Sequence, residues 1–525
     1  MFTNNMDSTE AKTKPDEQKS DLKQKFTDFR KDIRRQQQRD LISNRRFMSS
    51  KSYEVQPNFE MKVDHIANNP NATKLLPKIQ EWIQSPVDIN KLGEYITAIN
   101  SQDIFQQHYG IINIRKILCN NKTQLIQEII DQNAVPRIME MAMNDSERHL
   151  QLEATWCLAN LASGTSEQTN SLIQKNVIDV FIRLAASEYS QIAEQAIWGL
   201  GNISGDCLDF RFLVLKSKAP EVLLSVYKKY ETNTTIITHI TWVFSNLCRI
   251  RGEKESYNPV LKMILETLVN TFVTQNHPDI LEDCLMGFCK YVKNKYIPIF
   301  CQIEFLQKLR QYYCSFFTNW QDNIIKLSAV HAIIGGVTSS EDIYTDMVIK
   351  VGFLGDLAKA TNMNNETLLR EICWICSNIA IGTDAQTTAF LTEPGLIDKI
   401  FEFAFREEEE LSKEAVWTIC NLTKSRLIDN INLLFSKGLL DLFKRYLSSG
   451  IDNKRVVLIL EAIIQLILFF ANHTPEGSQN TFVLKLIETG IAEQIEMLQH
   501  HPADIVYLKA LHILENYFDL EDEPI

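Results

Sequence analysis

The chain has 525 residues, which is enough for three or four ordinary domains or for one extended array of repeats. Its 18 glycines and 14 prolines are each about half of the usual share of roughly 7% and 5%. So few turn-forming residues argue against a β-sandwich, a collagen-like fibre or a Gly/Pro-rich disordered chain, while 45% hydrophobic residues suffice for a large core. We therefore expect a mostly helical protein.

The net charge of −12 is unevenly distributed along the chain. Residues 22–51 carry ten Lys or Arg side chains against three Asp, a net charge of +7, so the other 495 residues carry −19. A basic arm on an acidic body indicates a segment that binds nucleic acid or docks on an acidic surface. Because an acidic body is a poor platform for nucleic acid, we favour docking and predict no direct contact with nucleic acid.

Neither a secretory signal nor a membrane span is predicted. The first 25 residues lack an apolar core, and the longest apolar run, Val456 to Ala471, is interrupted by Glu461 and Gln465 as in a buried amphipathic helix. Eleven cysteines without a dense framework are typical of reduced thiols in the cytosol or nucleus.

Internal similarity is the strongest pattern along the chain. The segment from Asn160 to Thr169 returns as Asn378 to Thr387 after 218 residues, which is five periods of about 43. Five tryptophans follow the same spacing, with intervals of 42 to 44 residues between neighbours: Trp156, Trp198 and Trp242, then Trp374 and Trp417. A period of 40–47 residues is typical of helical solenoids of the armadillo and HEAT kind.

Capping signals predict where the repeated helices begin and end. Gly164 suits a helix stop, and Thr165 with Gln168 forms a T-x-x-Q capping box for the next helix; Gly382, Thr383 and Gln386 repeat the pattern. Each period is therefore expected to hold two or three short helices that bury their apolar faces by stacking on neighbours. We predict a basic arm with a disordered tail over 1–60, a repeat array over 61–512, and the end of the last helix with an acidic tail over 513–525.

Each of the five tryptophans is followed four residues later by asparagine: Asn160, Asn202, Asn246, Asn378 and Asn421. Residues at i and i+4 share one helical face, so stacked repeats would align the indoles and amides in two rows, here called the ladder. An Asn amide can bind the main chain of an extended peptide, and parallel indoles can bracket the aliphatic stems of Lys or Arg. Acidic groups at the ends of these slots would complete a site for a basic peptide.

The structural alternative is that the tryptophans belong to the core and the asparagines satisfy loops. Core positions usually vary among Leu, Ile, Val and Phe, because volume is what matters there. Repeated use of Trp with Asn therefore favours recognition.

The residues around the ladder resemble the importin alpha family, the armadillo-repeat receptors for nuclear localisation signals. The resemblance rests on Glu153 to Thr169, Glu194 to Asp206, Trp242 to Arg249, Glu371 to Asn378 and Lys413 to Asn421, and it continues to Leu514 to Phe518. It implies an all-α fold, a right-handed superhelical solenoid of about ten armadillo repeats with a flexible basic N-terminal arm. It also implies a nuclear import adaptor that shuttles between cytoplasm and nucleus and uses no cofactor.

Two signal-binding sites follow from the resemblance. The major site comprises Trp156, Asn160, Gly164, Thr169, Gln195, Trp198, Asn202, Asp206, Trp242 and Asn246. Within it, the family pattern implies that the key lysine of the signal meets Asp206, the carbonyl of Gly164 and Thr169. The minor site comprises Glu371, Trp374, Asn378, Glu414, Trp417 and Asn421.

The basic arm resembles the importin-beta-binding segment of the same family. The matching residues are Arg30, Lys31, Arg34, Arg35, Arg39, Arg45 and Arg46. In the family this segment also folds back onto the groove as an autoinhibitor. Here the stretch from Asn44 to Phe47 holds two basic residues where the family has three, so we do not expect strong autoinhibition.

The central repeats depart from the family pattern. Counting one period from Trp242 places the ladder at Leu285 and Cys289, and a second period places it at Ser328 and Ala332, where the family has Trp and Tyr, then Arg and Asn. We therefore expect a weakened minor site on its N-terminal flank.

Two other protein classes remain as alternatives. An armadillo scaffold for adhesion or signalling would normally present a basic groove, and an enzyme is disfavoured because the sequence has no Walker loop, dinucleotide fingerprint or nucleophile elbow. Cys373 and Cys376 lack a second pair at zinc-ligand spacing. The expected partners are importin beta, cargo proteins with basic signals and, by resemblance, a nuclear export receptor.

Overall fold

The computed structural model describes residues 72–119, 123–249, 258–289, 291–292, 294–448, 452–475 and 478–518. The predicted basic arm, including all seven of its proposed contact residues, and the acidic tail lie outside these ranges. The chain divides into two compact units, Met1–Gly252 and Glu253–Ile525, each considered separately below.

The described part of the first unit contains four successive groups of helices. The first group is α2 (Ala72–Gln84), η3 (Ile89–Lys91), α3 (Leu92–Ile99) and α4 (Ile104–Cys119). The second is α5 (Thr123–Asp131), α6 (Val135–Ala142) and α7 (Arg148–Leu161), and the third is α8 (Ser166–Ile173), α9 (Val177–Ala185) and α10 (Ser190–Asp206). The fourth is α11 (Leu208–Lys216), α12 (Ala219–Lys229) and α13 (Thr234–Leu247).

Six groups make up the described part of the second unit. The first two are α14 (Asn258–Thr274) with α15 (Pro278–Phe288), then η5 (Asn294–Tyr296), α16 (Ile297–Phe300), α17 (Ile303–Cys314), η6 (Phe317–Asn323) and α18 (Ile324–Thr338). The next two are α19 (Asp342–Val351), α20 (Phe353–Ala360) and α21 (Glu366–Ala380), then α22 (Asp384–Thr392), α23 (Leu396–Ala404) and α24 (Glu409–Leu422). The last two are α25 (Ile428–Ser436), α26 (Leu439–Tyr446) and α27 (Asn453–Ala471), then α28 (Thr481–Glu488), α29 (Ile491–Met497), η7 (Leu498–His500) and α30 (Asp504–Tyr517).

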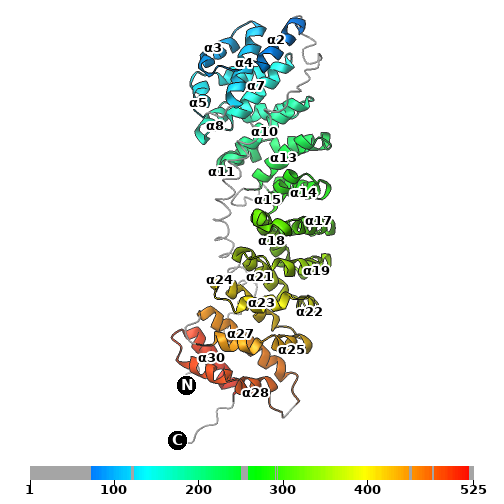
Figure 1. Ribbon diagram of the computed structural model, residues 1–525, viewed down its shortest axis with the longest axis vertical. Coiled ribbons are helices and arrows are strands. Elements are labelled where there is room, and N and C mark those ends of the chain that lie inside the picture. Colours follow the sequence, from blue (N-terminus) through cyan, green and yellow to red (C-terminus); the bar gives the residue numbers. More distant parts are fainter. Residues whose placement is uncertain are drawn as a thin grey trace, which may run out of the picture. The chain divides into compact units, whose positions relative to one another are not determined.

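The last helix of each group packs against its counterparts in neighbouring groups. In the first unit α4 contacts α7, α7 contacts α10, and α10 contacts α13. In the second unit α15, α18, α21, α24, α27 and α30 contact one another in the same serial way, as can be followed along each unit in Figure 1. The repeat unit predicted from the 43-residue period, two or three short helices that stack on neighbours, is confirmed.

Local chemistry explains where these helices begin. Thr165 and Thr383 each accept a hydrogen bond from the backbone N–H three residues later, while Gln168 and Gln386 return a side-chain contact to the cap. Both predicted capping boxes are therefore confirmed. The described residues form helices and turns with no strand, as the composition predicts.

Most of the side chains buried between the helices are apolar. The most deeply buried large side chains include Phe181 and Phe244 in the first unit and Phe288, Tyr313 and Phe403 in the second. Each lies on a helix whose apolar face meets the next helix of the stack, so no group could bury its core alone.

Candidate functional site

The five ladder tryptophans occupy one structural position on the last helices of their groups. Each lies nine residues after the N-cap residue of its helix, as Trp156 does after Glu147 on α7 and Trp374 after Asn365 on α21. Four of the indoles are half-buried, whereas Trp242 is only 3% exposed. The indoles thus share one register, and all but one present an edge or face at the surface.

The ladder asparagines join adjacent repeats. The side-chain amide of Asn202 donates to the carbonyl of Ala159 (2.9 Å), and that of Asn246 donates to Gly201 (3.3 Å). In the second unit Asn378 donates to Gly335 and Asn421 to Ser377, both at 3.2 Å. These acceptors lie one repeat earlier, so the amide ties neighbouring last helices together. These bonds go to carbonyls of neighbouring helices and not to loops, so they differ from the structural alternative considered for the asparagines.

Each of these amides keeps hydrogen-bonding capacity beyond the inter-repeat bond. An Asn side chain has two N–H donors and one acceptor oxygen, and the inter-repeat bond uses one donor. The Oδ1 atom of the fully buried Asn202 has no hydrogen-bond partner among the described residues. The Oδ1 atom of Asn421 accepts from the exposed Lys424 ammonium (3.3 Å). Main-chain groups of an extended peptide have the chemistry to meet these remaining positions.

Asn160 differs from the other ladder asparagines in its partner. Its amide donates to the thiol sulfur of Cys119 at 3.6 Å instead of to a carbonyl. Sulfur is a weak acceptor, so Asn160 contributes less to the joint between repeats than Asn202 does.

A buried ion pair supports the first tryptophan. The Arg115 guanidinium lies 4.5 Å from the centre of the Trp156 ring and pairs with Glu153, which is three residues before that tryptophan. Burial disfavours the charge of Arg115, but the Glu153 carboxylate outweighs burial and raises the pKa of the guanidinium above its usual range. One face of the Trp156 indole is therefore covered by the Arg115 guanidinium, a cation of the protein itself.

The second and third tryptophans contact each other. The ring centres of Trp198 and Trp242 are 4.9 Å apart with their planes tilted by 31°. His239 meets Trp198 edge-on at 5.2 Å. In this conformation the rings touch, so the expected slot between this pair of indoles is closed.

Residues expected to bind the key lysine come together at the start of α8. The Ser166 hydroxyl donates to Asp206 (2.6 Å), which holds that carboxylate beside the turn containing Gly164. Thr169 is fully buried and its hydroxyl donates to the carbonyl of Ala162 (3.3 Å). Its oxygen keeps acceptor capacity, so Asp206, Gly164 and Thr169 offer acceptors suited to an ammonium group. Gln195 is buried on α10.

At the expected minor site both acids are buried. Glu371 is 1% exposed and accepts from His331 of the preceding group (3.2 Å), whose other ring nitrogen contacts the Tyr313 hydroxyl (2.7 Å). Glu414, on the next last helix, is 8% exposed. The Trp374 indole packs against Gly335, where a Cβ atom would overlap the ring.

The structure corrects the ladder positions counted for the central repeats. Nine residues after their N-cap residues, α15 and α18 carry Met286 and Ala332, not Leu285 and Ser328. Met286 and Ala332 are half-buried like the ladder indoles, whereas Leu285 is fully buried.

The Asn position shifts with the Trp position in these repeats. In α18 it falls at Gly336, directly after the Gly335 carbonyl that Asn378 binds, so the prediction that Ala332 takes the Asn position is wrong. In α15 it falls at residue 290 instead of Cys289, and residue 290 is not among those described. For α18 the fixed period fails because the connection containing η5, α16, α17 and η6 separates Met286 from Ala332 by 46 residues.

Sequence reasoning missed three contacts at the expected sites: Arg115 with Trp156, His239 with Trp198, and His331 with Glu371. For His239 a signal was present, since it lies three residues before Trp242, where the other ladder helices carry Glu153, Gln195, Glu371 and Glu414. For Arg115 and His331 no spacing rule pointed to the contact, because each reaches a residue about 40 positions later.

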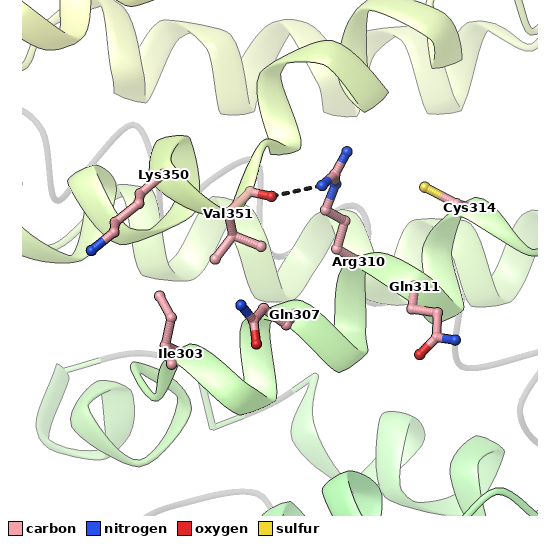
Figure 2. Close-up of a pocket in the computed structure, with 7 residues that line it drawn as sticks. All are labelled: Ile303, Gln307, Arg310, Gln311, Cys314, Lys350 and Val351. Carbon is pink, nitrogen blue, oxygen red and sulfur yellow. Dashed lines mark hydrogen bonds between the residues drawn. The ribbon is translucent and has the colours of Figure 1, made fainter.

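A cavity of about 320 Å³ is lined by residues of α17 and α19 (Figure 2). Arg310 lines it, donating to the carbonyl of Val351 (2.8 Å) and forming an ion pair with Asp356 of α20. Its charge is therefore already compensated, and no predicted site residue lines this cavity.

Within the described ranges, no three His, Cys, Asp or Glu side chains gather as metal ligands would. In that same part of the chain, no helix combines the length and the apolar character that crossing a membrane requires.

Comparison with known repeats identifies the helix groups. The armadillo/beta-catenin-like repeat matches residues 122–163 and 165–205, which are α5 to α7 and α8 to α10. An atypical armadillo repeat matches residues 480–525. The predicted all-α armadillo fold is therefore confirmed.

Curated relatives align with most of the chain. Importin subunit alpha-1b of Oryza sativa subsp. japonica is 26% identical over 436 residues, covering 82% of this chain and 79% of the relative. Importin subunit alpha-5 of Arabidopsis thaliana is 26% identical over 435 residues, covering 82% of both chains. A shorter match of 161 residues to importin subunit alpha-2 of Arabidopsis thaliana reaches 35% identity and covers 31% of this chain and 30% of the relative.

The fold also matches a solved structure. The crystal structure of an engineered protein superimposes with a TM-score of 0.62 at 17% identity, covering 82% of this chain and 99% of that one. Armadillo repeats and long alignments make this chain similar to importin alpha subunits over about four fifths of its length, and its ladder lies in one structural register.

Proposed function

We propose that this protein is a nuclear import adaptor that binds basic localisation signals of cargo proteins along its ladder and links them to importin beta. One observation carries the proposal: asparagines in one register hold neighbouring repeats together with one amide hydrogen and keep further donors and acceptors beside half-buried indoles. Such a row binds the main chain of an extended peptide without reading its side chains, while the indoles select cationic stems.

Charge supports a basic ligand over an acidic one. The chain outside residues 22–51 carries −19, and Asp206 with the Gly164 carbonyl offers acceptors to an ammonium group. An adhesion scaffold, whose basic groove binds an acidic partner, would instead need a positively charged groove. The proposal assigns the protein a binding role and no catalytic one, with transit between cytoplasm and nucleus.

The minor site is proposed as the weaker of the two. Ala332 occupies the ladder position of α18, so the last helix before α21 contributes no indole to the ladder. Trp374 and Trp417 with Asn378 and Asn421 remain for a second basic cluster.

The test is a titration of the full chain with a fluorescein-labelled peptide rich in Lys and Arg, followed by anisotropy. Trp156→Ala is expected to weaken binding about 2- to 30-fold, because one cation–π contact contributes about 0.5–2 kcal/mol. Trp320→Ala is the matched control, since Trp320 lies on η6 outside the ladder and its loss should leave affinity unchanged.

Two further measurements complete the test. Affinity should fall as salt rises, because the contacts are charge-assisted. An acidic peptide of equal length should not bind. Tighter binding of the acidic peptide, or equal losses in Trp156→Ala and Trp320→Ala, would refute the proposed groove.

A further inference from the structure

Trp198, Trp242 and His239 form a closed aromatic cluster at the centre of the major site. The two indoles are 4.9 Å apart, and His239 meets Trp198 edge-on at 5.2 Å. Trp242 is 3% exposed, whereas the other four ladder indoles are half-buried. The cluster therefore buries the Trp242 indole, while the other four ladder indoles stay accessible.

A basic side chain has no room between these rings as they stand. Carbon atoms in contact lie about 3.5–4.0 Å apart, so a methylene stem between two ring faces needs them about 7–8 Å apart. The pair comes closer because α10 carries Gly201 beneath Trp242, where a Cβ atom would overlap the indole. The absence of a side chain at Gly201 lets the Trp242 ring settle inward.

An unsatisfied acceptor lies in the same place. Asn202 is one turn from Trp198 and adjacent to Gly201, and it is fully buried, whereas Asn160 and Asn378 are each 8% exposed. Its amide nitrogen binds Ala159, but its Oδ1 atom has no partner among the described residues. A buried acceptor without a donor costs free energy, so the closed arrangement leaves a bond that a peptide N–H could make.

We propose that the Trp198/Trp242 pair is a gate over the central rung of the groove, and that His239 is the positioning residue that holds it closed. The proposal rests on the proposed function and adds a conformational step to it. An incoming basic side chain displaces Trp198 from Trp242 and takes its place against the ring. Opening also exposes Asn202 Oδ1 to the main chain of the peptide. The observed affinity is then the intrinsic affinity reduced by the fraction of open molecules.

The experiment combines circular dichroism with the peptide titration on the full chain. Two indoles in contact couple their transitions and give an exciton couplet, which should be present in the free protein and absent in Trp242→Phe. Saturating Lys/Arg-rich peptide should remove the couplet as the rings separate. Trp320→Phe, which removes an indole outside the ladder, should retain it.

A pair of substitutions tests His239 itself. His239→Asn removes the ring edge that holds Trp198, and it should tighten peptide binding about 2- to 10-fold, the range that an aromatic edge contact corresponds to. His239→Phe retains an aromatic edge and should restore the original affinity. A purely structural role would instead weaken binding in the Asn variant.

The possible outcomes distinguish a failure of the gate proposal from a failure of the proposed function. Peptide binding that leaves the couplet unchanged overturns the gate while the proposed function stands. Failure of the peptide to bind, with the couplet present, refutes the proposed function instead. A free protein without a couplet also overturns the gate.

Discussion

Asparagine at the ladder position has a structural task as well as a proposed binding task. Asn202, Asn246, Asn378 and Asn421 each donate to a carbonyl of the preceding repeat. That bond explains why Asn recurs where another small polar residue would suit a peptide equally well: its two-sided amide donates inward and keeps an acceptor. A loss of peptide binding after Asn→Ala can therefore come from a lost peptide contact or from a weakened joint between repeats. Asn160 separates the two effects, because its amide does not bind a carbonyl of the preceding repeat.

Asn202→Ala should lower the free energy of unfolding by about 1–3 kcal/mol, because the buried carbonyl of Ala159 loses its donor. Asn160→Ala should cost much less, since its partner is the Cys119 sulfur at 3.6 Å. Urea unfolding of the full chain followed by circular dichroism measures both. Equal midpoints for the two variants would contradict the structural role assigned to the Asn202 amide.

Among helices, the contact between successive last helices sets the geometry of the ladder. Trp242 packs on Gly201 of α10, and Trp374 packs on Gly335 of α18, so an indole lies against the preceding helix backbone in each unit. The same two glycines supply the carbonyls that Asn246 and Asn378 bind. In each unit, close helix approach and the inter-repeat hydrogen bond therefore depend on the same glycine, Gly201 or Gly335.

Gly201→Ala should destabilise the first unit by about 1–3 kcal/mol, because the added methyl group overlaps the Trp242 ring in a packed region. Gly93→Ala is the control in the same unit: its Cβ would meet only Gln132 Oε1 at 4.0 Å, and helix propensity favours Ala. Thermal unfolding measures both. A Gly201→Ala variant as stable as Gly93→Ala would show that the ring has space to move.

At the scale of the whole molecule, charge divides the chain into an arm and a body. Residues 22–51 carry +7 against −19 elsewhere, and the body contains the ladder with its acceptors for basic groups. An arm of that charge suits an acidic carrier such as the importin beta partner proposed above. The same charge would also attract the arm to the body's own groove, but the short basic stretch at Arg45 and Arg46 leads us to expect no strong autoinhibition.

Deleting residues 1–60 should abolish capture by immobilised importin beta while leaving binding of the Lys/Arg-rich peptide intact, because the arm and the ladder are separate sites. Arg34→Ala with Arg35→Ala should weaken capture in the full chain through the same contacts. Since the arm has only two adjacent basic residues at Arg45 and Arg46, the deletion should tighten peptide binding only modestly. Undiminished capture by the truncated chain would refute the role of the arm.

Sequence by itself determined the repeat, its helical character and the five rungs of the ladder, because a helix places i and i+4 on one face and equal repeats stack in register. The capping boxes at Thr165 and Thr383 were likewise local and readable. Only the tertiary structure decided the rest. The central register depends on connection lengths, which moved the rungs to Met286 and Ala332. The Asn bonds, the Arg115 contact and the closed Trp198/Trp242 pair join residues about 40 positions apart, and their geometry depends on how closely the helices pack.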